Sequence, residues 1–172
     1  EVVLAAPLGN YRLMAKMDLL VVEFGERFVI VDWKTVSKLP SRATLAGRLQ
    51  TRVYRYLAVE VGASLNGGQP PAPEQVEMIY WFAQFGGDTR RFVYDGVQHA
   101  ADAEYLLALV DQIASHREAI WPLTAEERGC GFCKYRSLCD RGVTAGLLAD
   151  LDDDLDMDEI EIDLEQIAEI EF

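Results

Sequence analysis

The chain has 172 residues, 50% of them hydrophobic, and this length and composition predict one globular domain with a packed core. No apolar run reaches the ~18 residues that span a bilayer, and the N-terminus lacks the basic flank of a signal peptide, so we expect neither a membrane protein nor a secreted one. The net charge of −13 does not exclude a nucleic-acid partner, because residues 147–172 hold twelve acids and no base, which leaves a net charge of −1 for residues 1–146.

The first part of the chain has the pattern of β-strands joined by tight turns. Strands are expected at residues 2–6 and 11–16, around a Pro-Leu-Gly-Asn turn, and at residues 19–23. Residues 28–31 form an apolar run of β-branched and aromatic side chains, which is typical of a central strand buried on both faces. That strand ends in the sequence Asp32-Trp33-Lys34-Thr35.

Two helices and a further hairpin are expected after these strands. The first helix covers residues 42–61 and ends at Gly62. Its buried face is expected at four-residue spacing, at Leu45, Leu49, Val53 and Leu57. After a Gly/Pro loop, residues 75–85 and 89–94 form a β-hairpin. The second helix covers residues 100–120, and its apolar side is formed by Leu106, Leu109, Val110 and Ile113.

The order of these elements predicts an α/β domain over residues 1–146, with a central sheet flanked by helices. It ends in a loop that carries three cysteines, and residues 147–172 follow as an acidic tail, which is either disordered or docked on the domain. Four aromatic residues are expected in the core of the sheet, namely Trp33, Tyr80, Trp81 and Phe82.

Three charged residues around the central strand have the chemistry that phosphodiester hydrolysis needs. Asp32 and Lys34 are two apart on a strand, so their side chains leave the same face, and a hairpin turn can bring Asp18 beside Asp32. Two carboxylates are the hard ligands that Mg²⁺ or Mn²⁺ prefers, and a lysine can stabilise the developing charge. Taken singly, each residue also fits an ordinary strand end.

The first helix adds polar and basic residues near that strand. Gln50 and Tyr54 are one turn apart and share a face, although this pair alone also fits an ordinary helix surface. A group of basic residues without any acid between Asp32 and Glu60 is expected to contact DNA phosphates, and its members are Lys38, Arg42, Arg48, Arg52 and Arg55. The alternative for this group is a solvated helix face.

The order Asp18, Asp32-Trp33-Lys34, Gln50-x-x-x-Tyr54 resembles the PD-(D/E)XK nuclease superfamily, and specifically its RecB-like branch. The resemblance implies a restriction-endonuclease-like fold with a central mixed sheet. It implies that Asp18 and Asp32 hold Mg²⁺ or Mn²⁺, with the backbone carbonyl of Val31 as a third ligand. Lys34 would be the catalytic lysine, and Gln50 and Tyr54 would belong to the active-site helix. The family's first helix has no counterpart here, so we expect the domain to lack it.

The three cysteines, Cys130, Cys133 and Cys139, are a poor disulfide framework and a better set of metal ligands in a reducing, cytoplasmic compartment. Their C-x2-C-x5-C spacing is similar to the motif that binds a [4Fe–4S] cluster in CRISPR-adaptation nucleases and in nuclease subunits of helicase–nuclease machines. No cysteine precedes Cys130, so the fourth ligand is not in this chain. The alternatives are a ligand from outside, a zinc site or three free thiols; His116 is a conceivable fourth ligand but fits a surface or packing histidine better.

The sequence therefore predicts a metal-dependent deoxyribonuclease, and an exonuclease in particular, that acts in DNA repair, recombination or CRISPR adaptation. The expected partners are DNA and a helicase or integrase-type protein. The main alternative is a catalytically silent nuclease-like module that binds DNA or a partner. A third reading makes the acidic tail the working part, as a polyanion that competes with DNA or binds a partner protein.

Overall fold

A computed structural model of the chain describes residues 1–116, 122–125, 127, 130, 133 and 135–142. It divides into two compact units, Glu1–Trp121 and Pro122–Phe172. The predicted tail and the predicted end of the second helix lie outside the described residues. Among the helices that are described, none is long and apolar enough to cross a membrane.

The first unit begins with a two-stranded ribbon and continues into a mixed sheet. Strands β1 (Val2–Leu8) and β2 (Tyr11–Met17) pair antiparallel around a turn at Gly9, whose φ of 58° favours glycine. The larger sheet has the order β3-β4-β5-β6, and its strands are β3 (Leu19–Glu23), β4 (Arg27–Lys34), β5 (Val76–Phe82) and β6 (Asp88–Val93). All six strands lie where the sequence predicts them, with ends that differ by a few residues.

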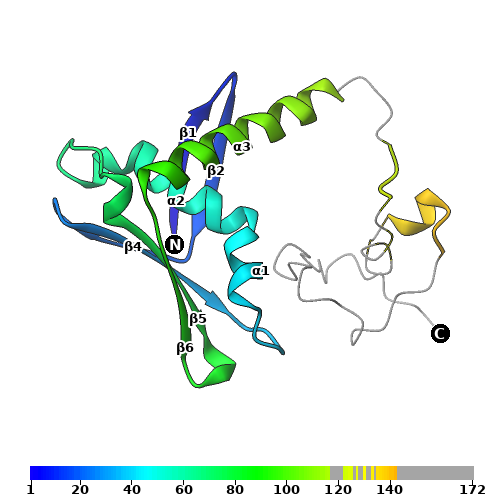
Figure 1. Cartoon of the computed structure of the whole chain (residues 1–172), viewed down its shortest axis with the longest axis horizontal. Helices are drawn as coiled ribbons and strands as arrows, with labels where there is room; N and C mark the ends of the chain where they lie inside the picture. Colours follow the sequence, from blue (N-terminus) through cyan, green and yellow to red (C-terminus); the bar gives the residue numbers. More distant parts are fainter. Residues whose placement is uncertain (117–121, 126, 128–129, 131–132, 134, 143–172) are drawn as a thin grey trace, which may run out of the picture. The chain divides into compact units, whose positions relative to one another are not determined.

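Strands β4 and β5 are parallel, whereas the outer pairs are antiparallel. A parallel pair needs a crossover, and two helices provide it. These are α1 (Arg42–Gly47), which is capped by the Ser41 hydroxyl, and α2 (Leu49–Val61). Figure 1 shows α2 beside the sheet, and α2 also contacts the β1–β2 ribbon. The predicted α/β fold with a central mixed sheet flanked by helices is confirmed.

The prediction of one continuous helix over residues 42–61 was wrong. Arg48 adopts an extended conformation, with φ −61° and ψ 139°, and separates α1 from α2 directly after Gly47, a residue of low helix propensity. The break changes the phase of the apolar positions. Leu45, Val53 and Leu57 are buried as expected, but Leu49 is 43% exposed.

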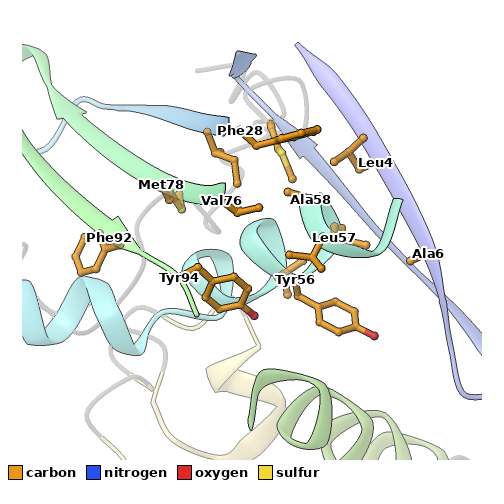
Figure 2. Packing of buried hydrophobic residues seen from close by; sticks show 14 of the residues in the cluster. Leu4, Ala6, Phe28, Tyr56, Leu57, Ala58, Val76, Met78, Phe92 and Tyr94 are labelled. Atoms are coloured by element: carbon orange, nitrogen blue, oxygen red, sulfur yellow. The ribbon is translucent and has the colours of Figure 1, made fainter. Parts of the chain in front are cut away.

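The core lies between the inner face of the sheet, α2 and the ribbon. The sheet contributes side chains that alternate along β4 and β5, and Figure 2 shows Phe28 and Val76 beside Ala58 of α2, with Met78 farther along β5. Tyr80 and Phe82 are fully buried on the same face, as predicted. Trp33 was expected in the core but is 45% exposed, because it alternates with Asp32 and Lys34 and therefore lies on the outer face.

Helix α3 (Gly96–Ser115) starts earlier than predicted, at an N-cap where the Asp95 carboxylate accepts the Gln98 N–H. Of its predicted apolar side, Leu106 is buried, but Ile113 is 59% exposed. In the second unit the described part of the cysteine segment includes a short helical turn, η5 (Arg136–Cys139).

Candidate active site

Asp32 and Lys34 lie at the end of β4 and face inward toward α2. Their exposed fractions are 2% and 3%, and Lys34 Nζ lies 3.1 Å from Asp32 Oδ2. Burying two charges is expensive unless they are paired and hydrogen-bonded, so this pair has a strong energetic reason to stay together. The aliphatic stem of Lys34 belongs to the inner face, and the Nζ atom lies 5.7 Å from the centroid of the Tyr80 ring.

Asp18 lies between β2 and β3 and is placed next to Asp32 by the antiparallel register. Leu19 pairs with Val31, so the residue before Leu19 is opposite the residue after Val31. The Asp18 Oδ2 atom accepts a hydrogen bond of 2.9 Å from the backbone N–H of Trp33. The hairpin geometry expected from the sequence is therefore present. Val31 itself lies in β4, between Leu19 of β3 and Ile79 of β5.

Gln50 and Tyr54 approach this pair of strands from the first turns of α2. The Gln50 Nε2 atom donates to Asp32 Oδ1 at 2.7 Å and to the Tyr54 hydroxyl at 3.1 Å. The Tyr54 hydroxyl donates in turn to the Lys16 carbonyl at 2.6 Å, which links α2 to the ribbon. The structure thus brings together Asp32, Lys34, Gln50 and Tyr54, with Asp18 alongside.

The pKa of the Tyr54 phenol is affected by the other members of the same cluster. Burial raises the pKa of its phenol, the hydrogen bond from Gln50 opposes that shift, and the carboxylates of Asp32 and Asp18 add to it. Both carboxylates therefore act on the same hydroxyl. The phenol remains protonated at neutral pH and keeps the proton that it donates to the ribbon.

The five predicted DNA-contacting residues are in different environments. Arg55 is 5% exposed and its guanidinium donates to the carbonyls of Thr51 and Val93 and to Gln98. Arg52 binds Asp102 of α3 at 2.9 Å. These contacts tie α2 to α3 and β6 and do not suit phosphate binding.

The other three basic residues lie at or before the start of α2. Lys38 and Arg42 are exposed, and the Arg42 guanidinium stacks 4.5 Å above the Phe92 ring. Arg48 is half-buried at the break between α1 and α2.

Tyr80 contacts the cluster and Thr51 contacts Tyr80, although the sequence analysis assigned neither residue a role in a site. The Tyr80 hydroxyl lies 2.6 Å from Thr51 Oγ1 and 3.4 Å from Gln50 Oε1. Tyr80 was predicted only as core, since its contact with α2 depends on the parallel register that sets Asp32 beside Tyr80. No local sequence signal reports that register.

The residues present fit a hard divalent cation. An ionised carboxylate has about four acceptor positions, so the contacts of Asp32 with Gln50 and Lys34 are compatible with a metal ion on the same group. Within the described part of the chain, no group of three or more His, Cys, Asp or Glu side chains could hold a metal ion. A site here would use the two carboxylates together with carbonyl, water or substrate oxygens, as Mg²⁺ commonly does.

The cysteines belong to the second unit. Arg141 donates to Cys130 Sγ at 3.1 Å and to the Thr124 carbonyl at 2.7 Å, and η5 ends at Cys139. Cys133 accepts at its carbonyl from Arg136. Among the residues that are described, these thiols form no metal-ligand group. His116 follows α3 in the first unit, where its Nδ1 lies 2.8 Å from the Gln112 carbonyl.

Comparison with known families identifies one match. The model of the PD-(D/E)XK nuclease superfamily matches residues 1–140, which include β1 to β6, the cluster around Asp32 and the three cysteines. No curated protein and no solved structure matches the chain.

Proposed function

Because the chain belongs to the PD-(D/E)XK nuclease superfamily, we propose that it is a metal-dependent deoxyribonuclease whose active site is the cluster around Asp32. The observation that carries the proposal is the convergence of Asp32, Lys34 and Gln50, three polar side chains from a strand and a helix, beside Asp18. Buried charged groups that converge on one spot are costly for stability, and such arrangements are typical of active sites.

In this proposal Asp18 and Asp32 hold Mg²⁺ or Mn²⁺, and the Val31 carbonyl is a candidate third ligand. The bound cation would supply a Lewis acid and lower the pKa of a water molecule. The Lys34 ammonium, fixed against Asp32, stabilises negative charge that develops on the phosphate. Gln50 orients the Asp32 carboxylate, and Tyr54 braces Gln50 against the ribbon.

DNA would be guided to the site by the basic residues before and at the start of α2. Lys38, Arg42 and Arg48 are the candidates for phosphate contacts in this proposal. Arg52 and Arg55 make internal contacts, with Asp102 and with the Val93 carbonyl, and the proposal assigns them no contact with DNA. Assignment to the RecB-like branch, and with it exonuclease activity, is supported by Gln50-x-x-x-Tyr54 on the helix that follows the Asp32 strand. Only the assignment to that branch supports a role in repair, recombination or CRISPR adaptation and a helicase or integrase-type partner.

A [4Fe–4S] cluster on Cys130, Cys133 and Cys139 remains part of the proposal on the strength of the cysteine spacing alone. Its fourth ligand would come from outside residues 1–172. The Arg141 guanidinium beside Cys130 would stabilise a thiolate, the form that binds iron or zinc.

Asp18→Asn is the most informative variant for testing the nuclease proposal. Asp18 is half-buried and, unlike Asp32, has no ion pair with Lys34, so its neutralisation disturbs the fold least. We expect the wild type to cleave labelled DNA with Mg²⁺ or Mn²⁺ and not with EDTA, and Asp18→Asn to lower the rate at least ~10²-fold, the scale of losing one preorganised charge.

Asp111→Asn, at an exposed acid of α3, is the matched control and should cleave like the wild type. Single- and double-stranded oligonucleotides labelled at either end would give the strand preference and polarity. Metal-dependent DNA binding without cleavage would favour the silent module instead. Cleavage by Asp18→Asn at the wild-type rate would exclude this site.

A further inference from the structure

A buried chain of hydroxyl groups lies directly behind the proposed metal-binding carboxylate. Tyr80 of β5 and Thr51 of α2 are both fully buried, with exposed fractions of 0%. Their oxygen atoms are 2.6 Å apart, and Thr51 Oγ1 also lies 2.6 Å from the Leu45 carbonyl near the end of α1. These hydrogen-bonded hydroxyl groups therefore connect β5 of the sheet to both helices of the crossover, α1 and α2.

The direction of each hydrogen bond in this chain follows from counting protons. The Leu45 carbonyl can only accept, so the single hydroxyl proton of Thr51 goes to it. Thr51 must then accept from Tyr80. The Tyr80 proton is shared, with a short arm to Thr51 and a longer one of 3.4 Å to Gln50 Oε1.

The same counting fixes the orientation of the Gln50 amide. The Tyr54 proton is donated to the Lys16 carbonyl, so Tyr54 can only accept from Gln50, which must present Nε2 on that side. Nε2 therefore donates to Asp32 and Tyr54, and Oε1 is directed back toward Tyr80. A flipped amide would place Oε1 against the Asp32 carboxylate and leave Nε2 against the Tyr80 hydroxyl.

We propose that Tyr80 and Thr51 are positioning residues that hold Gln50, and through it the Asp32 carboxylate, in the orientation that binds the divalent cation. This inference rests on the proposed function. Neither residue belongs to the proposed set of metal ligands, and both act through Gln50. Hydrogen-bond partners behind a ligand set the orientation of that ligand, and their loss typically lowers metal affinity or activity by about 10–100-fold.

The Tyr80→Phe variant isolates the hydroxyl, because the ring that faces Lys34 at 5.7 Å and fills the core is retained. Thr51→Val removes the second hydroxyl at nearly constant volume, whereas Thr51→Ser retains the hydroxyl and removes only the methyl group. Tyr94→Phe is the matched control. Tyr94 is also buried, but its hydroxyl donates to Asp102 at 2.9 Å, away from Gln50 and Asp32.

The experiment measures Mn²⁺ binding to the full chain by isothermal titration calorimetry in the absence of DNA, with thermal unfolding as the check on folding. Tyr80→Phe and Thr51→Val should weaken Mn²⁺ binding by about 10-fold or more. Thr51→Ser and Tyr94→Phe should bind like the wild type, although Tyr94→Phe lowers the unfolding temperature. The Mg²⁺ concentration for half-maximal cleavage should shift in the same order.

The outcomes separate this inference from the proposed function. If the wild type binds Mn²⁺ and cleaves DNA while folded Tyr80→Phe and Thr51→Val bind Mn²⁺ equally well, the positioning role is wrong and the nuclease assignment stands. If Tyr94→Phe weakens Mn²⁺ binding as much as Tyr80→Phe, the effect is one of general stability, which also overturns the role. A wild type that neither binds Mn²⁺ nor cleaves DNA overturns both proposals.

Discussion

The buried ion pair between Asp32 and Lys34 makes a strong prediction about stability. From the sequence alone, removing either charge should impair cleavage and leave the fold intact. In the structure both side chains are at most 3% exposed, so loss of one leaves the other charge buried without the opposite charge 3.1 Å away. Breaking such a pair costs about 3–5 kcal/mol, a large share of the roughly 5–15 kcal/mol that stabilises a domain.

A double-mutant cycle of Asp32→Leu and Lys34→Met measures this cost directly. Each single variant should lose about 3–5 kcal/mol of unfolding free energy, whereas replacing both charges by apolar groups removes the unpaired charge and is often nearly neutral. The double variant also deprives Gln50 Nε2 of its Asp32 acceptor, which costs about 1–3 kcal/mol. The double variant should therefore be more stable than either single variant, and inactive.

Urea unfolding followed by far-UV circular dichroism gives the four free energies by linear extrapolation. The coupling energy between the two residues is the loss of stability in the double variant minus the sum of the losses in the two single variants. We expect its magnitude to be several kcal/mol. Single variants that unfold at the wild-type urea concentration would refute the reasoning, because a buried charge that loses its opposite charge must lose stability. Losses that simply add in the double variant would refute it as well.

Three further predictions concern other parts of the chain. Asp102→Asn should destabilise the first unit by about 3–5 kcal/mol in urea unfolding, because Arg55 is 5% exposed and Asp102 is the acidic partner of both Arg52 and Arg55; wild-type stability would contradict this. Lys38→Ala or Arg42→Ala should lower the slope of log binding constant against log salt concentration by the amount expected for about one phosphate contact. Arg27→Ala, at the far end of β4 and paired with Glu23, should leave that slope unchanged. Equal slopes for all three variants would contradict a DNA path along Lys38 and Arg42. Anaerobically purified protein, supplied with ferrous iron, sulfide and a small thiol as the fourth ligand, should assemble an iron–sulfur cluster at the cysteines, and stoichiometric zinc without iron on metal analysis of the purified protein would overturn the cluster.

Much of the candidate site could be predicted because its rules are local. Alternation along a strand is enough to place Asp32 and Lys34 on one face, and a short turn is enough to return Asp18 to that position. Gln50 and Tyr54 are one helical turn apart, which holds whatever the helix packs against. The strands were predicted for the same reason, since their pattern repeats within a few residues.

The errors arise where the outcome depends on tertiary packing. The break at Arg48 interrupts a regular apolar pattern, and periodicity alone does not distinguish one helix of twenty residues from two helices joined at an extended residue. Trp33 is hydrophobic in a central strand, yet its exposure is decided by which face of the sheet receives α2. A strand in a mixed sheet need not be covered on both faces, and the composition of the strand does not reveal this.

The arginines of α2 show why charge patterning is a weak guide to a binding surface. Arg52 and Arg55 follow Arg48 at helical spacing and appear in sequence as one stripe with Lys38 and Arg42. In the structure they contact Asp102, which is about fifty residues away in the chain and is the only acid of the first turns of α3 that is buried. Without that acid, burying Arg55 would be prohibitively costly, and with it the arginines fasten α3 to the helix that carries Gln50. Arg52 and Arg55, which the sequence analysis expects to contact DNA, therefore hold in place the helix on which the proposed active site depends.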